Sequence, residues 1–211
     1  MSPLSLNNLS KLLLTLWLAA VMLTASPVRA GVPTEQVKAT VDKVFVVLRD
    51  PRLKSTAKQS ERREQVKQAL FNRFNFAEMA KRSLGSNWAR RTPQEQEEFV
   101  RLFTEVLERA YADLIESYSD EKIIYLNEKI DGGYADVSSK VVTAKGEEYS
   151  INYRAQLIDN EWRIYDVVAE NISLVNNYRS QFSRVIAKSS YEELVRRLKD
   201  KNEFAGPPPK K

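Results

Sequence analysis

One change in the spacing of apolar residues, close to residue 119, restricts the fold of this chain more than any other feature. Before it, apolar residues recur every three or four positions, which is typical of amphipathic helices. After it, they alternate with polar residues and are rich in β-branched side chains, which is typical of strands. The predicted order is helices, then strands joined by short links, then a final helical region. This order predicts an α+β fold.

The clearest predicted helix covers residues 93–118. Thr92, Pro93 and Glu95 fit a capping box, in which the Thr92 side chain caps the helix and Glu95 reaches back to the Thr92 backbone. The apolar stripe of this helix keeps a 3.6-residue period and consists of Phe99, Leu102, Phe103, Val106, Leu107, Ala110, Tyr111, Leu114, Ile115 and Tyr118. Such a stripe either packs as core or lines a cavity.

Shorter helices are predicted on both sides of the strands. Residues 33–48 form the first, and Ser60 is the predicted N-cap of the second. Asn75 and Gly85 bound the third, because Asn caps helix starts and Gly ends helices in left-handed geometry. Residues 174–198 form a last helical region.

Four strands are predicted, over residues 123–126, 134–143, 148–158 and 162–169. The connections between them are short, which indicates an antiparallel meander. The fourth strand carries apolar side chains at both its odd and its even positions. Both of its faces are therefore expected to be covered.

The composition excludes several kinds of chemistry, because the chain contains no histidine and no cysteine. Serine–histidine triads, thiol chemistry and the usual zinc sites are ruled out, and no cofactor or metal is expected. The formal net charge is +5, but positive and negative residues are interspersed without a basic block. Binding to nucleic acid is therefore not predicted.

The first thirty residues have the pattern of a secretory signal peptide. Lys11 precedes an apolar run over residues 12–25, which is shorter than the ~20 residues of a membrane-spanning helix. Val28-Arg29-Ala30 resembles a signal-peptidase cleavage site, with a small residue at Ala30. The mature chain is therefore expected to begin at Gly31 and to be exported. Residues 31–203 are then expected to form a single domain, and residues 204–211 a disordered tail.

Three ordered motifs in this sequence match a known family. They are Leu-Gly-Ser-Asn-Trp at residues 84–88, Trp-Arg-Ile-Tyr-Asp-Val at 162–167, and Glu-Asn-Ile-Ser-Leu-Val at 170–175. Together they resemble the MlaC family of periplasmic phospholipid-binding proteins, also called the toluene-tolerance family. Asn171 departs from the family pattern, in which many members carry Gly, but Asn tolerates left-handed geometry.

The resemblance implies a fold like that of nuclear transport factor 2, with helices packed on the concave side of a curved antiparallel sheet. It also implies a non-enzymatic, monomeric shuttle in the periplasm that holds acyl chains in an apolar pocket and leaves the headgroup in water. Its partners would be an inner-membrane ABC transporter complex and an outer-membrane lipoprotein complex. Its cargo would be a phospholipid or, as in a hopanoid-linked branch of the family, a related lipid.

The pocket walls are expected to come from the long helix, the sheet and the last helical region. The lipid-binding residues predicted on this basis are Leu102, Phe103, Val106, Leu107, Val141, Tyr153, Tyr165, Val167, Ile172, Val175 and Tyr178.

Two other readings of the residues stay open. Asp166 and Glu170 lie on one face near the end of the fourth strand and could act as an acid–base pair in an exported enzyme, or orient the turn into the next helix. Alternatively, the chain is a periplasmic interaction module with a filled core. Arg154, Arg163 and Arg179 could contact a phosphate or form a solvated face.

Overall fold

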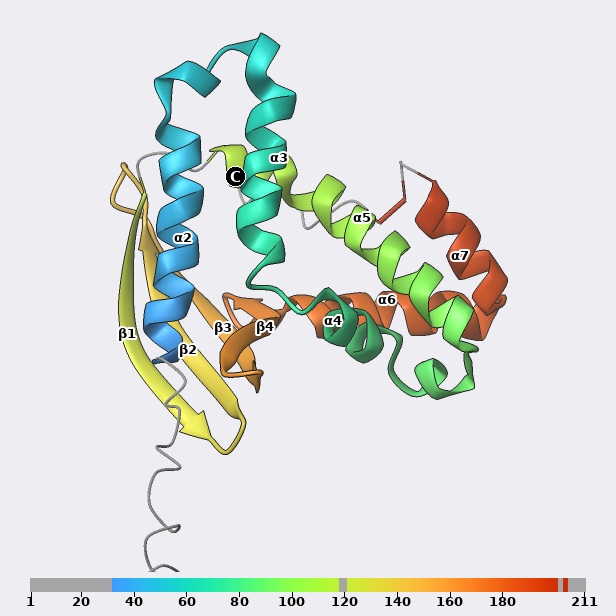
Figure 1. Cartoon of the computed structure of the whole chain (residues 1–211). Helices are drawn as coiled ribbons and strands as arrows, with labels where there is room; N and C mark the ends of the chain where they lie inside the picture. Colours follow the sequence, from blue (N-terminus) through green and yellow to red (C-terminus); the bar gives the residue numbers. More distant parts are fainter. Residues whose placement is uncertain (1–31, 118–120, 201–202, 205–211) are drawn as a thin grey trace, which may run out of the picture.

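The computed structural model describes residues 32–117, 121–200 and 203–204. The predicted signal peptide and all of the predicted tail except Phe204 lie outside this part. The α+β class is confirmed, since helices precede and follow one antiparallel sheet (Figure 1). Among the described residues, none of the helices combines the length and the apolar character needed to cross a membrane.

The helices agree with the predicted segments, and short 3₁₀ turns lie between some of them. In chain order they are α2 (Pro33–Arg49), η2 (Pro51–Leu53), η3 (Thr56–Lys58), α3 (Gln59–Phe71), α4 (Phe76–Leu84), η4 (Gly85–Arg90), α5 (Pro93–Ser117), α6 (Leu174–Lys188) and α7 (Tyr191–Lys199).

Gly85 ends α4 with a positive φ, as predicted, and of the three predicted N-caps two are confirmed and one is wrong. The Thr92 amide donates to Glu95 Oε2 over 2.8 Å, and the Glu95 amide donates to Thr92 Oγ1 over 3.2 Å. Asn75 Oδ1 accepts from the Glu78 amide over 3.0 Å. Ser60 does not cap α3, because η3 leads the backbone directly into the helix and α3 begins one residue earlier.

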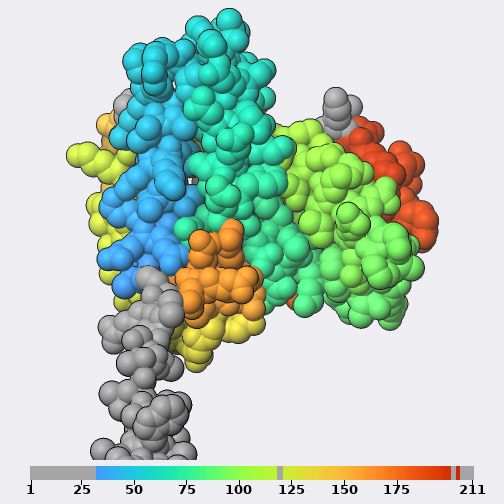
Figure 2. Space-filling view, viewed as in Figure 1, coloured from blue at the N-terminus to red at the C-terminus, as the bar shows by residue number. Residues whose placement is uncertain are grey.

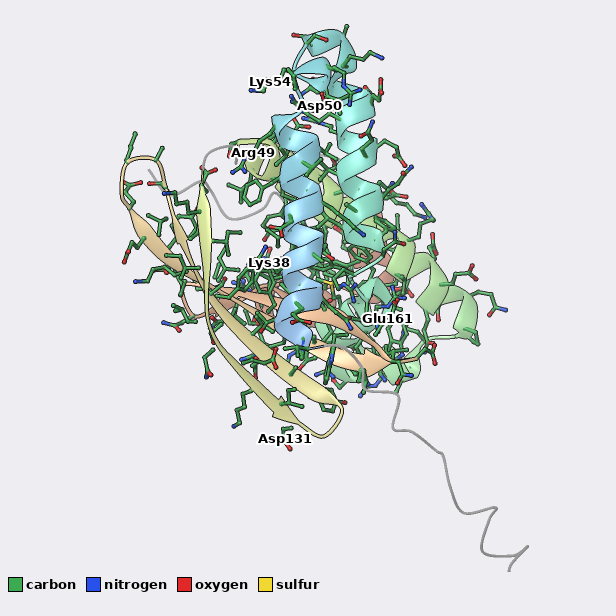
Figure 3. The ribbon with its side chains drawn as sticks, turned by 60° about the vertical axis from the view of Figure 1, so that its left-hand side comes forward. Lys38, Arg49, Asp50, Lys54, Asp131 and Glu161 are labelled. Atoms are coloured by element: carbon green, nitrogen blue, oxygen red, sulfur yellow. The ribbon has the colours of Figure 1, made fainter. Side chains whose placement is uncertain are left out.

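The sheet is an antiparallel meander in the order β1-β2-β3-β4-β5. Its strands are β1 (Lys122–Asp131), β2 (Tyr134–Val142), β3 (Glu148–Ile158), β4 (Glu161–Ala169) and the two-residue β5 (Ile172–Ser173). The first four correspond to the predicted strands, although β1 continues to Asp131, five residues beyond the predicted end at Leu126. Strand β5 pairs with the end of β4. Figure 3 shows Asp131 at the turn from β1 to β2 and Glu161 at the start of β4.

A β-bulge shifts the alternation of side chains in β4. Arg154 pairs with Asp166 whereas Ala155 pairs with Ile164, so Tyr165 is an extra residue in β4. Ile164 and Val167 consequently pack in the same apolar cluster although they are three residues apart. This insertion explains why apolar residues occupy both odd and even positions of this strand.

Four apolar clusters form the interior of the described part of the chain; three of them involve helices, and the fourth, around Trp162, lies within β2, β3 and β4. Helices α4 to α7 share a helical cluster with Phe99, Phe103 and Phe182 at its centre. The inner face of the sheet packs against α2 through a sheet cluster that contains Val37. The third, the hairpin cluster, joins α2 to α3 around Val66. The space-filling view shows α2 and α3 side by side next to the sheet, with α5 and α7 on the other side of the molecule (Figure 2).

Polar contacts fix α2 across the inner face of the sheet. The Thr34 amide and hydroxyl donate to Glu128 Oε2 on β1 over 2.7 and 2.6 Å. The Gln36 side-chain oxygen accepts from the Trp162 amide on β4 over 2.9 Å. Helix α2 therefore contacts both the first and the fourth strand. Phe204, the first residue of the predicted tail, lies with its ring centroid 5.2 Å from that of Phe182.

Candidate functional site

A layer of half-buried apolar side chains follows α2 from the sheet to the hairpin cluster. Val41 packs in the sheet cluster, and Phe45, one turn further along α2, packs in the hairpin cluster. Each has half-buried apolar neighbours from other elements. We call this set the apolar seam, and it consists of Val41, Phe45, Leu70, Ile115, Tyr125, Ile151 and Val167.

Tyr125 brings an unsatisfied polar group into the apolar seam. Its hydroxyl oxygen is buried and has no hydrogen-bond partner within the described part of the chain. Burial, with smaller contributions from Tyr153 and Asp42, raises the pKa of Tyr125 well above its ordinary value. A buried hydroxyl without a partner costs about 1–3 kcal/mol, so a ligand or a water molecule that bonded to it would be favoured.

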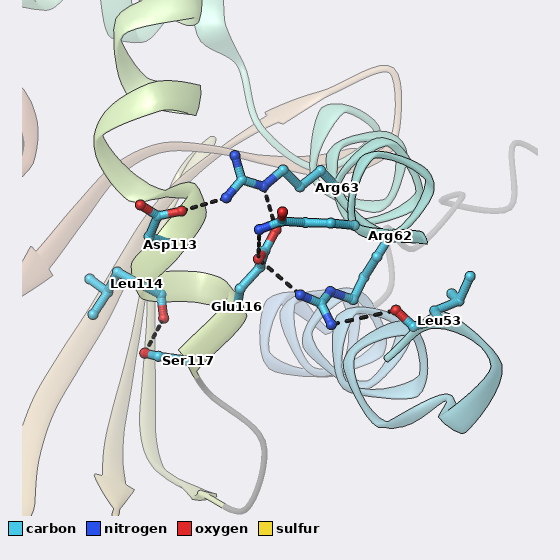
Figure 4. Close-up of polar contacts among 8 residues, drawn as sticks. Leu53, Arg62, Arg63, Asp113, Leu114, Glu116 and Ser117 are labelled. Carbon is cyan, nitrogen blue, oxygen red and sulfur yellow. Dashed lines mark hydrogen bonds and ion pairs between the residues drawn. The ribbon is translucent and has the colours of Figure 1, made fainter. Parts of the chain in front are cut away.

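An ionic clamp closes one end of the seam by fastening α3 to the last turn of α5. Glu116 accepts from Arg63 Nε over 2.6 Å and from Arg62 Nη2 over 3.0 Å, and Arg63 also pairs with Asp113 (Figure 4). Arg62 Nη1 in turn donates to the Leu53 carbonyl in η2. Burial opposes the charged form of Glu116, but the bonds from Arg63, Arg62 and Gln59 outweigh it and lower the pKa of this carboxyl.

A second feature is a pocket of about 420 Å³ between α4, η4, the β3–β4 pair and the start of α6. We call it the basic pocket, because four of its lining side chains are cationic and one is acidic. These are Lys81, Arg82, Arg154, Arg179 and Asp166. The Tyr165 ring also lines it, with the Arg82 guanidinium carbon 4.1 Å from the ring centroid.

The basic pocket and the apolar seam lie on opposite faces of the sheet. Arg154 lines the pocket, whereas its neighbour Tyr153 packs in the sheet cluster. On β4, Asp166 likewise lines the pocket, whereas its neighbour Val167 packs in the sheet cluster. Successive residues of a strand point to opposite faces, so β3 and β4 separate the two sites.

Asp166 and Glu170 bond to different groups. Asp166 is 3% exposed and accepts from Ser173 Oγ over 2.7 Å, from the Val175 amide over 3.1 Å and from Arg154. Glu170 lies in an exposed turn, and its Oε1 accepts from the Ser150 amide over 2.6 Å. These bonds agree with the structural reading, in which Asp166 orients the turn into α6.

The eleven predicted lipid-binding residues fall into several groups. Six pack in the helical cluster, namely Leu102, Phe103, Val106, Leu107, Val175 and Tyr178. On the sheet, Tyr153 and Val167 belong to the sheet cluster, and Val141 on β2 is also buried. Tyr165 lines the basic pocket, and Ile172 is 61% exposed.

Sequence reasoning missed the contribution of α2 and α3 to the seam. The apolar stripe over residues 33–48 predicts a buried helix face, but the stripe does not specify which element it faces. Leu70 and Val41 are ordinary core residues by their spacing. Lys81 and Arg82 of the basic pocket carry no sequence signal that separates them from solvated charges.

The architecture is that of an α+β protein in which helices cover the inner face of an open antiparallel sheet. The model of one family, described as MlaC protein, matches residues 38–200, and the chain belongs to this family. The resemblance found in the sequence motifs is thereby confirmed.

Individual relatives agree with this assignment. The intermembrane phospholipid transport system binding protein MlaC of Haemophilus influenzae is 22% identical over 88% of this chain and 89% of its own length. The toluene tolerance protein ttg2D of Pseudomonas putida is 26% identical over 46% of each chain. A phospholipid-binding protein from Ralstonia solanacearum, solved in complex with a phospholipid, has a TM-score of 0.72 and 26% identity, and the match covers 82% of this chain and 97% of that one.

Proposed function

We propose that this protein binds a phospholipid as a component of an intermembrane lipid transport system. The observation that carries the proposal is the apolar seam, which leaves apolar side chains of the sheet and of the α2–α3 hairpin half-buried. The family assignment and the phospholipid in the Ralstonia structure support it.

Acyl chains are proposed to lie in the seam against the inner face of the sheet. Val167 of the seam, with the buried Val141 and Tyr153 behind it, would form the sheet wall. Burial of each methylene there would contribute about 0.8 kcal/mol. Entry requires the hairpin to move relative to the sheet, and the clamp at Glu116 opposes that movement. The predicted residues of the helical cluster are proposed to support this wall from a packed core, with Tyr165 and Ile172 outside it.

The place of action is proposed to be the periplasm. The signal-peptide pattern before Gly31 supports export. The partners are proposed to be an outer-membrane lipoprotein complex and an inner-membrane ABC transporter complex, between which a monomeric, non-enzymatic carrier shuttles lipid. The names of the Haemophilus and Pseudomonas relatives support a transport system with a role in solvent tolerance.

Native mass spectrometry of the protein purified from cells tests the proposal. We expect a mass increment that disappears on solvent extraction and that lipid analysis identifies as phospholipid. A protein that carries no lipid, and that takes up none from phospholipid vesicles, would contradict it.

A paired substitution locates the site. In Val167→Glu a carboxylate must be desolvated against hydrocarbon, so we expect co-purified lipid to fall at least about fivefold, because a charge in an apolar site costs several kcal/mol. Val195→Glu is the matched control, since Val195 is also half-buried but packs on α7 against the helical cluster. Melting temperatures of both variants separate loss of lipid from loss of fold. Normal lipid content in a folded Val167→Glu protein would place the acyl chains elsewhere.

A further inference from the structure

The proposed binding of acyl chains in the apolar seam assigns no role to the basic pocket. Its volume of about 420 Å³ lies within the range of roughly 300–1,000 Å³ that is typical of small-ligand sites. Three helical elements, α4, η4 and α6, and two strands contribute to it, so its side chains converge from separate parts of the chain. We propose that the basic pocket binds a phosphate group, at a site separate from the apolar seam.

The charges around the pocket are only partly balanced. Glu78 bonds to Arg82 over 2.8 Å and lies 3.7 Å from Lys81. Arg154 lies 3.3 Å from Asp166 and 3.5 Å from Asp136, and both distances are longer than the 2.7–2.9 Å of a strong charge-assisted bond. The guanidinium of Arg154 can therefore form a shorter bond with an added anion.

Arg179 is the cation of the pocket whose charge the surrounding described residues do not pair. Within the described residues, its side chain forms neither an ion pair nor a hydrogen bond. Arg179 is exposed, and the stem of its side chain lies over Gly85, where an added Cβ would be 3.2 Å from Arg179 Cδ. Gly85 has a φ of +58°, a conformation that favours glycine.

A phosphate group fits this arrangement better than a carboxylate or a halide does. A guanidinium presents paired N–H donors that match the oxygens of a phosphate, and three arginines approach the pocket from α4, β3 and α6. A phosphate carries enough oxygens to bond to more than one of them. Lys81 adds a flexible positive charge at the same place.

This inference goes beyond the proposed function, because β3 and β4 separate the pocket from the seam. The phosphate would therefore not be that of a lipid whose acyl chains lie in the seam. It comes either from a phospholipid headgroup at a membrane surface or from a free phosphate, and one set of variants distinguishes these sources.

The first experiment measures the binding of inorganic phosphate and of glycerol 3-phosphate by titration calorimetry. We expect saturable binding that Arg179→Gln weakens roughly tenfold to a hundredfold, the effect of losing one hydrogen bond to a charged group. Arg184→Gln is the matched control, because Arg184 is an exposed arginine on the same helix and the change in net charge is identical. Gln keeps most of the stem over Gly85, and a thermal melt verifies that Arg179→Gln is folded.

Backbone amide spectra provide a second readout of position. Addition of inorganic phosphate should shift the Gly85 and Asn176 resonances, since both residues line the pocket. Shifts confined to residues outside the basic pocket would overturn the proposal.

The second arm uses vesicles of phosphatidylcholine alone and of an equimolar mixture with phosphatidylglycerol. Co-sedimentation with the mixed vesicles that falls with Arg179→Gln but not with Arg184→Gln supports a headgroup at a membrane surface. Binding of the soluble phosphates alone, with the same dependence on Arg179, supports a free phosphate. If neither probe binds, or if Arg179→Gln and Arg184→Gln behave alike, the proposal is overturned.

The two proposals fail independently. Val167→Glu should lose lipid and keep phosphate binding, whereas Arg179→Gln should lose phosphate binding and keep co-purified lipid. A Val167→Glu protein that is folded but has lost both would show that the sites are one, which overturns the separate phosphate site.

Discussion

At the scale of single residues, Asp166 connects the end of the sheet to the start of α6. Its carboxylate accepts from Ser173, which is itself the N-cap of α6, and from the Val175 amide in the first turn of that helix. Arg154 on the neighbouring strand bonds to the same carboxylate. One buried acid thus fixes β5, the direction of α6 and one wall of the basic pocket.

Substitution of Asp166 by Asn should destabilise the fold. The amide keeps a single acceptor oxygen and places an NH₂ group against donors, so we expect a loss of about 2–3 kcal/mol in the free energy of unfolding, as for other buried charged hydrogen bonds. Denaturant titration measures it. Glu170→Gln, in an exposed turn, is the control and should change stability by less than about 0.5 kcal/mol. Equal effects of the two substitutions would contradict the assigned role.

Residue-scale predictions succeeded where the cause is local. The Thr92 and Asn75 caps depend on side chains that bond three residues away along the chain, and both are confirmed. The Ser60 cap is wrong because η3, which has no strong sequence signal, brings the backbone into helical geometry before that residue. The bulge at Tyr165 depends on pairing with β3, which the residues of β4 alone do not specify.

At the scale of elements, the contact between α3 and α5 depends on the ionisation of Glu116. Hydrogen bonds in the folded state lower the pKa of this carboxyl below its ordinary value of 4.5. The unfolded state then binds more protons as the pH falls, so folding is disfavoured in acid. The stabilisation is complete above about pH 4.5 and is lost as the pH falls through the lowered pKa.

Glu116→Gln should therefore flatten the pH dependence of stability below about pH 4.5 and cost about 1–3 kcal/mol at neutral pH, since two arginines lose a charged acceptor. Denaturant titrations of both proteins at several pH values give the comparison. Asp113→Asn is the control, because Asp113 pairs with the same Arg63 but its side chain is 87% exposed. If the stability of the Glu116→Gln protein depends on pH as steeply as that of the parent protein, other carboxyl groups determine the loss of stability in acid.

The helices and strands could be predicted more completely than the elements against which each of them packs. The stripe of α5 indicates a buried face, and its members Phe99, Leu102, Phe103, Val106 and Leu107 are indeed buried. The same stripe extends to Ile115, which packs in the hairpin cluster instead. A periodic pattern specifies that a face is covered, whereas the choice of neighbour follows from how distant elements pack. Of the residues in the apolar seam, Val167 was among the predicted lipid-binding residues, whereas Tyr125, Ile151 and the residues of α2, α3 and α5 were not.

At the scale of the whole molecule, stability depends on apolar packing and on ion pairs between elements. The chain lacks histidine and cysteine, and the described residues include no cluster of acids suited to a metal ion. We expect excess chelator to move the melting temperature by less than about 1 °C, well under the ~2–4 °C that 1 kcal/mol produces in a protein of this size. Scanning calorimetry with and without chelator checks this, and a shift of several degrees would reveal a bound ion.

The position of α2 has a consequence for the order in which this chain acquires its structure. The Gln36 side chain meets the Trp162 amide across 126 positions of sequence, and Val37 is covered by residues of β2, β3 and β4. During synthesis, helix α2 therefore emerges long before the strands that shield it. Contacts this distant along a chain delay folding, because a large loop must close before they form. Helix α2 can pack early against α3, its partner in the hairpin cluster, but the side of α2 that faces the sheet must remain without its native partners until β4 has been made.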